Sequence, residues 1–395
     1  MFFLWSGAAI SLAEIMTGSL IVPLGLKKGI AVILTGHLIG CLILALTGLI
    51  GFQKNTSALK SSRLAFGRYG SYAVSVFNIV QLIGWTAVML IQCANSIRAI
   101  AGSPAGRLFF MALVLGVGAL VAVWVLFADK GLQLINSAAV ALLFLLCLVI
   151  IGLILGFRHM ASAASGTIST GAALELSIVM PLSWLPLISD YTMNAKSKKS
   201  CFWGSFLGYF AGSSFMYIIG LAAVLFTKSQ DITGAILHLG IGAAGLVVVV
   251  LATVTTTYLD VYSAVMSTLN ILPRAPKRLL ILIITAAGTL AAMFFPIGQY
   301  QNFLYAIGSI FAPVFSVVLV DYFLLRADHS ATRINWAAIL SAAVGTFAYY
   351  VFLRLDWVLG STVPSMIIAA AAYLAAGSIP GRLGAAPETQ AEKKA

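Results

Sequence analysis

The segment ELSIVMPLSWLPLISDYT, residues 175–192, is apolar enough to enter a membrane, yet it carries two prolines near its middle. Pro181 and Pro186 each remove a backbone hydrogen bond and crowd the preceding helical turn. Interrupted backbone inside a bilayer is tolerated only where protein encloses it or where it lines a watery cavity. This segment therefore predicts a broken transmembrane helix beside an internal site.

A second interrupted segment, FFLWSGAAISLAEIMTGSLIVPLG, occupies residues 2–25. Gly7, Ser11 and Glu14 break its apolar run. The segment lacks the basic leader of a secretory signal peptide, so we expect it to remain as a membrane-spanning helix.

Composition places the whole chain in a membrane. Of its 395 residues, 61% are hydrophobic and 9% are charged, and the mean hydropathy is +1.05. A soluble chain of this length needs far more charge to cover its surface, and apolar runs of the ~20 residues that cross a bilayer recur throughout. We predict an all-α integral membrane protein with twelve transmembrane helices, near residues 2–22, 30–51, 71–99, 107–128, 132–157, 172–191, 201–227, 240–267, 279–296, 299–325, 335–353 and 357–378. The polar tail, residues 379–395, is expected to be disordered.

The two interrupted helices are the first and the sixth, which are corresponding positions in two halves of five helices. Paired interruptions of this kind are typical of transporters built from inverted repeats, with the site near the bilayer midplane. We predict repeats at residues 1–157 and 172–325, followed by two further helices in residues 335–378. The alternative is an ordinary pair of kinked helices.

The net charge of +12 reflects membrane topology rather than nucleic-acid binding, because the basic residues lie at the ends of apolar runs. If both termini are cytoplasmic, most of the 23 Lys and Arg residues fall on the inside. The outside loops then hold only Lys27, Lys28, Arg98, Arg107, Arg158, Lys228 and Arg354. We expect a multi-pass protein of the cell membrane. Its four cysteines lack metal-ligand spacing, and we expect them and His37 to serve in packing.

The eighth predicted helix contains LATVTTTYLDVYSAVMSTLN, residues 251–270. At about 100° per residue, Ala252, Thr256 and Asp260 share one side of it, with Thr255 adjacent. A carboxylate at membrane depth costs at least ~2.5–3.5 kcal/mol unless it meets an ion, a partner or water. The segment thus predicts a cation or polar-ligand site; alternatively, the threonines bond to carbonyls of their own helix.

The third helix, SVFNIVQLIGWTAVMLIQCANSI, residues 75–97, is also polar for a membrane segment. Gln81 and Trp85 lie on one side of it, four residues apart. Tryptophan in membrane helices usually anchors the interface. Trp85 lies mid-helix instead, where its flat ring can face a planar ligand.

Four segments together resemble the nucleobase–cation symport family 1, which includes cytosine permeases and hydantoin transporters. They are GAAISLAEIMTG (7–18), QLIGWTAV (81–88), SDYTMNAKSKK (189–199) and FLYAIGSIFAPVFSVVLVDYFLLR (303–326). The chain is most similar to the branch of hydroxymethylpyrimidine transporters, which is associated with uptake of a thiamine precursor. The resemblance implies the LeuT-like fold of two inverted five-helix repeats, coupled to sodium.

The family's sodium site joins carbonyls of helix 1 to one carbonyl and two hydroxyls of helix 8. On this chain the resemblance places it at Gly7 and Ile10 and at Ala252, Thr255 and Thr256.

For the substrate, the resemblance implies stacking on Trp85, with Gln81 beside it, Ser11 facing the ligand and Trp184 as a second aromatic ring. Glu14 and Asp260 depart from the family's pattern. A carboxylate is suited to accept hydrogen bonds from an aminopyrimidine, and we assign that role first to Asp260 and then to Glu14. Either carboxylate can instead carry a coupling proton.

The leading hypothesis is import of a small planar pyrimidine, such as hydroxymethylpyrimidine, by sodium symport, with the protein acting as a monomer. The alternatives are a proton-coupled permease for cytosine or another nucleobase, an amino-acid carrier of the same fold, and an intramembrane enzyme. Glu14 would repel the carboxylate of an amino acid. Neither an H-E-x-x-H nor a G-x-S-x-G motif is present, so we expect no enzymatic activity.

Overall fold

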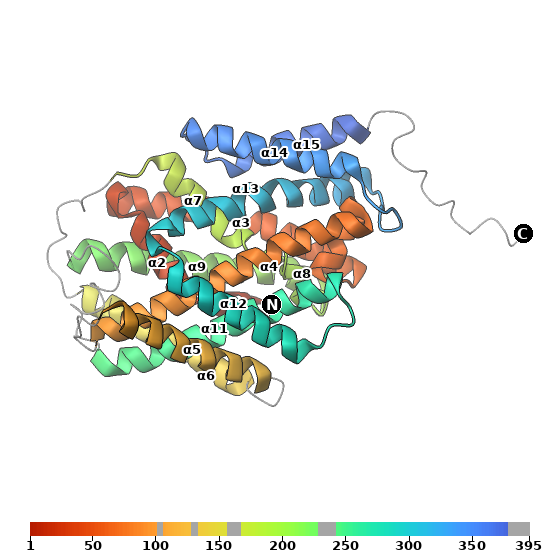
Figure 1. Cartoon of the computed structure of the whole chain (residues 1–395). Helices are drawn as coiled ribbons and strands as arrows, with labels where there is room; N and C mark the ends of the chain where they lie inside the picture. The colour runs from red at the N-terminus through yellow and green to blue at the C-terminus, as the bar shows by residue number, and fades with distance from the viewer. Residues whose placement is uncertain (101–105, 128–132, 156–166, 228–241, 378–395) are drawn as a thin grey trace, which may run out of the picture.

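The computed structural model describes residues 1–100, 106–127, 133–155, 167–227 and 242–377, and these are almost entirely helical (Figure 1). The predicted disordered tail, 379–395, lies outside the described residues. The helices are α1 (Phe2–Ala9), α2 (Leu12–Leu20), α3 (Gly25–Lys54), α4 (Ala58–Ile100), α5 (Arg107–Phe127), α6 (Gln133–Leu155), α7 (Thr170–Leu182), α8 (Ile188–Thr192), α9 (Lys198–Thr227), α11 (Gly242–Ile271), α12 (Lys277–Phe294), α13 (Tyr300–Leu319), α14 (Trp336–Arg354) and α15 (Thr362–Gly377). Short 3₁₀ turns at Val22–Leu24 and Ile297–Gln299 precede α3 and α13, and a π-helical turn, η3 (Val320–Leu325), extends α13.

Every one of the twelve predicted helices has a counterpart among the described residues. Eight helices are long and apolar enough to cross a membrane, and the pair α1 and α2, bent by 61°, forms a ninth span. Three shorter apolar helices, Val140–Leu153, Thr170–Leu182 and Thr362–Gly377, stand where the remaining spans are predicted. Large apolar side chains such as Leu108, Val123 and Phe347 are exposed on outer helices, as a lipid-facing surface requires.

Three predicted boundaries are wrong, each near a glycine with positive φ. Helix α3 begins at Gly25, with φ of 71°, rather than at residue 30. The region before residue 71, predicted as a loop, is helical from Ala58, and α4 is interrupted at Gly67 with φ of 76°. A Cβ at Gly67 would meet the backbone carbonyl of Thr332 at 2.9 Å, so the kink is also a close contact. At the other end of the chain, α15 begins at Thr362 rather than at 357, because Gly360 ends the preceding turn with φ of 71°.

The interrupted helices occupy the interior. Nearly every residue of α7 and most of α2 are buried. Helix α9 packs against α1, α2 and α3, while α4 packs along α11. The last two helices, α14 and α15, pair with each other and with α13 at one edge of the molecule (Figure 1). The broken segments are thus enclosed by continuous helices, as interrupted backbone at membrane depth requires.

Candidate functional site

The break between α1 and α2 is built by Ile10 and Ser11. Ser11 is extended, with φ of −146° and ψ of 158°, and its hydroxyl caps α2 by accepting the N–H of Glu14 at 3.4 Å. The sequence S-L-A-E is the pattern of a capping box. Among the described residues, the Glu14 carboxyl group shares hydrogen bonds with Tyr209 and Ser213 and accepts none from Ser11 N–H. The capped turn therefore directs Glu14 away from its own backbone.

The break between α7 and α8 follows from Pro186. In the run of tight turns after Pro181, Trp184 N–H bonds to Pro181 and Leu187 N–H bonds to Trp184. Pro186 has no N–H to offer the carbonyl of Ser183. The side-chain amide of Gln81 donates to that carbonyl instead, at 3.0 Å. A residue of α4 therefore supplies the hydrogen bond that the proline removes.

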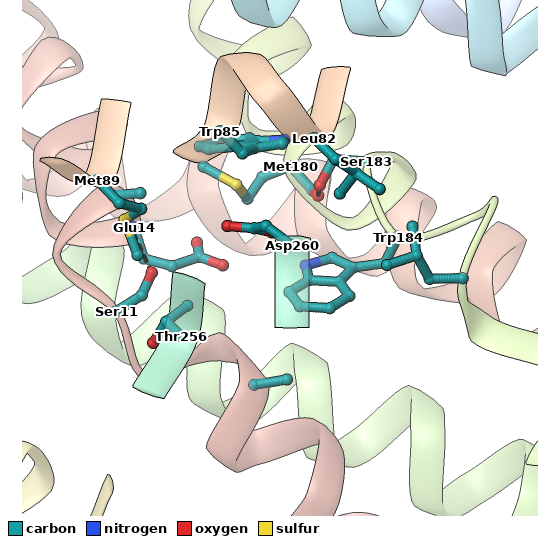
Figure 2. Close-up of a pocket in the computed structure, with 13 residues that line it drawn as sticks. Ser11, Glu14, Leu82, Trp85, Met89, Met180, Ser183, Trp184, Thr256 and Asp260 are labelled. Atoms are coloured by element: carbon teal, nitrogen blue, oxygen red, sulfur yellow. Dashed lines mark hydrogen bonds between the residues drawn. The ribbon is translucent and has the colours of Figure 1, made fainter. Parts of the chain in front are cut away.

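The two breaks open onto one cavity. Its cavity volume is about 30 Å³. The lining comes from α1, α2 and their junction, from α4, from α7 and the following turn, and from α11 (Figure 2). The lining residues are Ala8, Ser11, Ala13, Glu14, Leu82, Trp85, Met89, Met180, Ser183, Trp184, Leu187, Thr256 and Asp260. Helices from both halves of the chain thus meet at a largely apolar pocket that contains two carboxylates.

Asp260 lies in this pocket on α11 and is only 6% exposed. Among the described residues, its carboxylate has no hydrogen-bond partner. Figure 2 shows it between the indole rings of Trp85 and Trp184 in that view. An ionised group held from water without a partner is costly, so the pocket presents an acceptor that a ligand, a proton or a cation can satisfy.

Glu14, across the pocket, is fully engaged. Tyr209 donates its hydroxyl to Oε1 at 2.7 Å, and Ser213 Oγ lies 2.6 Å from Oε2. Tyr209 in turn accepts the indole N–H of Trp184 at 2.9 Å. The two carboxylates of the pocket thus differ: helix α9 holds Glu14, while Asp260 is open to a ligand.

Two tryptophans supply the flat surfaces of the pocket. Trp85 is 7% exposed and is held edge-on by Tyr300 and Phe303 of α13, with ring centroids at 6.1 and 5.3 Å. Trp184 lies against the buried Trp5 of α1, at 5.8 Å between centroids and nearly perpendicular. Both rings line the pocket, and these edge-on contacts fix their orientations.

The residues predicted to bind a cation are only partly assembled at the pocket. Thr256 lines it, whereas Thr255 donates its hydroxyl to Leu251 at 2.9 Å, as the alternative interpretation of the threonines has it. The carbonyl of Gly7 accepts the N–H of Ile10 at 3.2 Å. Ala252 lies in α11, and its side chain is outside the described part. Hydroxyls and carbonyls freed at a helix break are suitable ligands for sodium.

Gln81 lies beside the pocket rather than in its lining, since its amide spans Asn78 and Ser183. Sequence reasoning missed Tyr209 and Ser213, which are hydroxyl residues of an apolar helix with no local sign of their partner. It also missed Glu175 of α7, which is fully buried and accepts hydrogen bonds from α14 and from the start of α15.

Two other acidic residues, Asp190 and Asp321, bond to groups of other helices. Asp190 accepts the N–H of Ala58 at 2.9 Å and so begins α4; no ion pair with Lys196 is found among the described residues. Asp321 accepts the hydroxyl of Tyr373 at 2.6 Å, with His329 Nε2 at 3.5 Å. Burial lowers the pKa of His329 below its ordinary value, so the imidazole is neutral at pH 7. Both aspartates therefore serve as helix anchors.

Two interrupted helices around a buried pocket with two carboxylates, in a chain of apolar helices, define a membrane transporter. Comparison with known proteins identifies which kind. Residues 1–376 match the family of permeases for cytosine/purines, uracil, thiamine and allantoin, and the chain belongs to that family. It is a transport protein of the nucleobase–cation symport 1 family rather than an enzyme.

Curated relatives and solved structures agree with this assignment. The cytosine permease of Escherichia coli (strain K12) is 25% identical over 80% of this chain and 76% of its own. A putative purine-cytosine permease of Bacillus subtilis is 21% identical over 93% of this chain and 90% of its own.

Among solved structures, the chain is similar to Mhp1, a nucleobase-cation-symport-1 family transporter, in a closed conformation with bromovinylhydantoin bound. The TM-score is 0.77 at 18% identity, over 94% of this chain and 90% of that one. A Na⁺-coupled sialic acid symporter has a TM-score of 0.67 at 15% identity, over 96% and 90% of the two chains. These likenesses confirm the predicted LeuT-like fold.

Proposed function

We propose that this chain imports a small planar pyrimidine by symport with sodium, and that hydroxymethylpyrimidine is its substrate. The observation that carries the proposal is the unpartnered carboxylate of Asp260, which lines a pocket with Trp85 and Trp184. A flat heteroaromatic ring can stack on an indole, and its amino and hydroxymethyl groups can donate to the carboxylate. Bonds to a charged acceptor are roughly twice as strong as neutral ones.

The proposed sodium site is Gly7, Ile10, Ala252, Thr255 and Thr256. The relevant support is that Thr256 lines the same pocket as Ser11, directly after the α1–α2 break. Sodium bound there would tie α11 to α1, and it would favour conformations in which the pocket is assembled. A ligand shifts such an equilibrium only by its differential affinity for the two states.

Cytosine is the second candidate substrate, because the relatives named above are cytosine permeases. Its ring carries an exocyclic amine that suits Asp260 equally well. We further propose that both termini are cytoplasmic, from the distribution of Lys and Arg, and that the protein works as a monomer.

The test is uptake into proteoliposomes of radiolabelled hydroxymethylpyrimidine and, separately, of cytosine, under an inward gradient of sodium or of protons. We expect sodium-driven uptake of hydroxymethylpyrimidine that Thr256→Ala abolishes. The matched control is Thr227→Ala, at the far end of α9 and outside the pocket lining.

Preference for cytosine would replace the substrate and leave the carrier mechanism intact. Uptake that ignores sodium but follows a proton gradient would refute the sodium site. If neither pyrimidine enters under either gradient, the substrate class is wrong.

A further inference from the structure

A continuous chain of hydrogen bonds leads from the pocket into the protein through Glu14, Ser213 and His37. Glu14 Oε2 and Ser213 Oγ are 2.6 Å apart, and Ser213 Oγ and His37 Nε2 are also 2.6 Å apart. His37 Nδ1 lies 2.9 Å from the carbonyl oxygen of Ile33, one turn earlier in α3. All three side chains are at most 2% exposed, so water does not complete their bonding.

Counting hydrogens along this chain limits its protonation. A carbonyl oxygen only accepts, so the Nδ1 of His37 carries a hydrogen toward Ile33. Ser213 has a single hydroxyl hydrogen and two close partners. If the imidazole is neutral, its Nε2 accepts the hydrogen bond from the Ser213 hydroxyl. Glu14 must then be a carboxylic acid that donates a hydrogen bond to Ser213. If Glu14 is ionised, its carboxylate accepts the hydrogen bond from Ser213 instead. The Nε2 of His37 must then be protonated and donate to Ser213.

The remaining combination, a carboxylate with a neutral imidazole, leaves one of the two 2.6 Å contacts without a hydrogen. Two buried acceptors would then face each other, which costs the full penalty of an unsatisfied polar group. Both permitted arrangements contain one proton more than this forbidden one. They interconvert by moving two hydrogens along the chain, from Glu14 to Ser213 and from Ser213 to His37.

The second oxygen of Glu14 is consistent with this count. Tyr209 accepts the indole hydrogen of Trp184 and donates its own to Oε1. Oε1 is therefore an acceptor, and the extra proton belongs on the side of Ser213.

We propose that Glu14, Ser213 and His37 form a proton-binding site that holds one proton in the conformation described here. The site joins three helices, since Glu14 lies on α2, Ser213 on α9 and His37 on α3. Loss of the proton breaks one of these links.

Other titratable groups face the site from the surrounding helices. Cys41 lies on α3, Tyr209 and Tyr217 on α9 and Tyr300 on α13, and Asp260 of α11 lies across the pocket. The ring of Tyr217 packs edge-on against His37, at 4.6 Å between centroids. The cysteine and the tyrosines are neutral near pH 7. Asp260 is the one acidic neighbour in this group, and a negative charge on it would strengthen binding of the proton.

Glu175 provides a matched contrast within the same chain. It is equally buried, but its oxygens face four groups, each of which can give a hydrogen of its own: the hydroxyls of Tyr349 and Thr362 and the backbone N–H groups of Ser361 and Thr362. Nothing in that arrangement calls for an extra proton. Two buried glutamates thus differ in proton content because of their partners.

Because Glu14 lines the pocket, occupancy of the proton site is linked to ligand binding, and such linkage is reciprocal. This consequence for transport rests on the proposed function. The proton site itself does not, and it can be tested without any substrate.

The experiment measures the apparent melting temperature of the full-length protein in detergent between about pH 7 and about pH 9. In this range, Glu and His of an unfolded chain are both largely without the proton. The site then holds one more proton in the folded protein than in the unfolded chain, so the stability that it contributes falls as pH rises. The site contributes up to about tenfold per pH unit to the unfolding equilibrium constant.

We expect Glu14→Gln to remove this contribution, because the amide donates permanently to Ser213. His37→Leu should shift the pH at which the melting temperature falls downward by about one unit or more. Ser213 is then free to donate to the Glu14 carboxylate, so deprotonation breaks no hydrogen bond. Glu175→Gln should lower the melting temperature at every pH and keep the pH dependence of the wild type.

The proposal is overturned if Glu14→Gln keeps the pH dependence of the wild type. It is also overturned if His37→Leu leaves the fall at the same pH, because Glu14 alone then binds the proton. If His37→Leu cannot be purified, infrared difference spectra between the two ends of the pH range replace it. They should show changes of both a carboxyl group and an imidazole, and both should be absent in Glu14→Gln; spectra of the wild type without an imidazole change refute the shared site.

Discussion

The two pocket carboxylates illustrate how partners assign roles to identical chemical groups. Glu14 is held by Tyr209 and Ser213, whereas Asp260 has no hydrogen-bond partner among the described residues. A group that is already bonded gains little from a ligand. A buried group without a partner gains a full hydrogen bond when the ligand arrives. Asp260 is therefore the residue at which ligand affinity depends most on a single side chain.

We expect Asp260→Asn to weaken pyrimidine binding by about 1.5–3 kcal/mol, roughly 10- to 150-fold in Kd, because a charged acceptor is lost while side-chain size is kept. Equilibrium binding of labelled ligand to the purified protein measures this. Asp328→Asn is the control, since Asp328 is exposed and bonds within its own loop. Equal affinities of Asp260→Asn and wild type would remove Asp260 from the site.

Pocket residues could be predicted from the sequence where the residue is unusual within its own helix. Trp85 and Asp260 stand out as polar or bulky residues inside apolar helices, and both line the cavity. The partners of Glu14 could not be found in this way, because Tyr209 is 195 residues away and looks like any tyrosine of a membrane helix. His37 was expected to serve in packing, and only its contact with Ser213 reveals a further role. Long-range pairs leave no periodic pattern in the sequence.

At the scale of elements, the helix breaks were predictable and the helix contacts were not. Pro181 and Pro186 predict the break between α7 and α8, and the interruption of an apolar run by Gly7, Ser11 and Glu14 predicts the break between α1 and α2. Which helix covers each break depends on shape instead. Glycines of α2 and α9 lie so close to the facing backbone that a Cβ at Gly220 would overlap the carbonyl oxygen of Ile15. Helix α9 thus reaches Glu14 because small residues let it approach.

This close approach predicts that Gly220→Ala destabilises the protein by at least about 1–3 kcal/mol, because the backbone must move to admit the methyl group. Gly116→Ala in α5 is the matched control, since nothing lies within 4 Å of a Cβ there. In a helix interior, that change is neutral or stabilising by up to about 1 kcal/mol. Thermal unfolding in detergent compares the two. If Gly220→Ala is as stable as Gly116→Ala, the α2–α9 contact is looser than described.

Helix α15 is fixed to α7 by the carboxylate of Glu175, which binds the N–H groups at its first turn, where the helix dipole favours negative charge. Glu175→Gln places an amide hydrogen against a donor and leaves at least one donor unsatisfied, at a cost of about 1–3 kcal/mol. Asp356→Asn on the neighbouring turn is exposed and has φ of 48°, which asparagine tolerates well. A lower melting temperature for Glu175→Gln alone would confirm the anchor, and equal temperatures would contradict it.

For the whole molecule, the fold follows from the pairing of two breaks, while the membrane orientation rests on charge alone. The helices would pack identically if the protein were inserted the other way round. Lys and Arg near the ends of apolar runs decide orientation during insertion, since moving them across the bilayer is unfavourable. The described residues therefore fix which loops share a side of the membrane, and the distribution of charge predicts which side is the cytoplasm.

The four native cysteines are buried and not in disulfides, so we expect the wild-type chain not to react with thiol labels. We predict that a membrane-impermeant maleimide applied to intact cells labels Lys28→Cys, in the first turn of α3, and does not label Lys196→Cys until the membrane is opened. Both positions are exposed, so accessibility within the protein does not distinguish them. Wild-type protein, expected to remain unlabelled, controls for reaction at the buried thiols. The reverse pattern would place the termini outside. Labelling of both variants in intact cells would mean that the charge distribution does not set a single orientation.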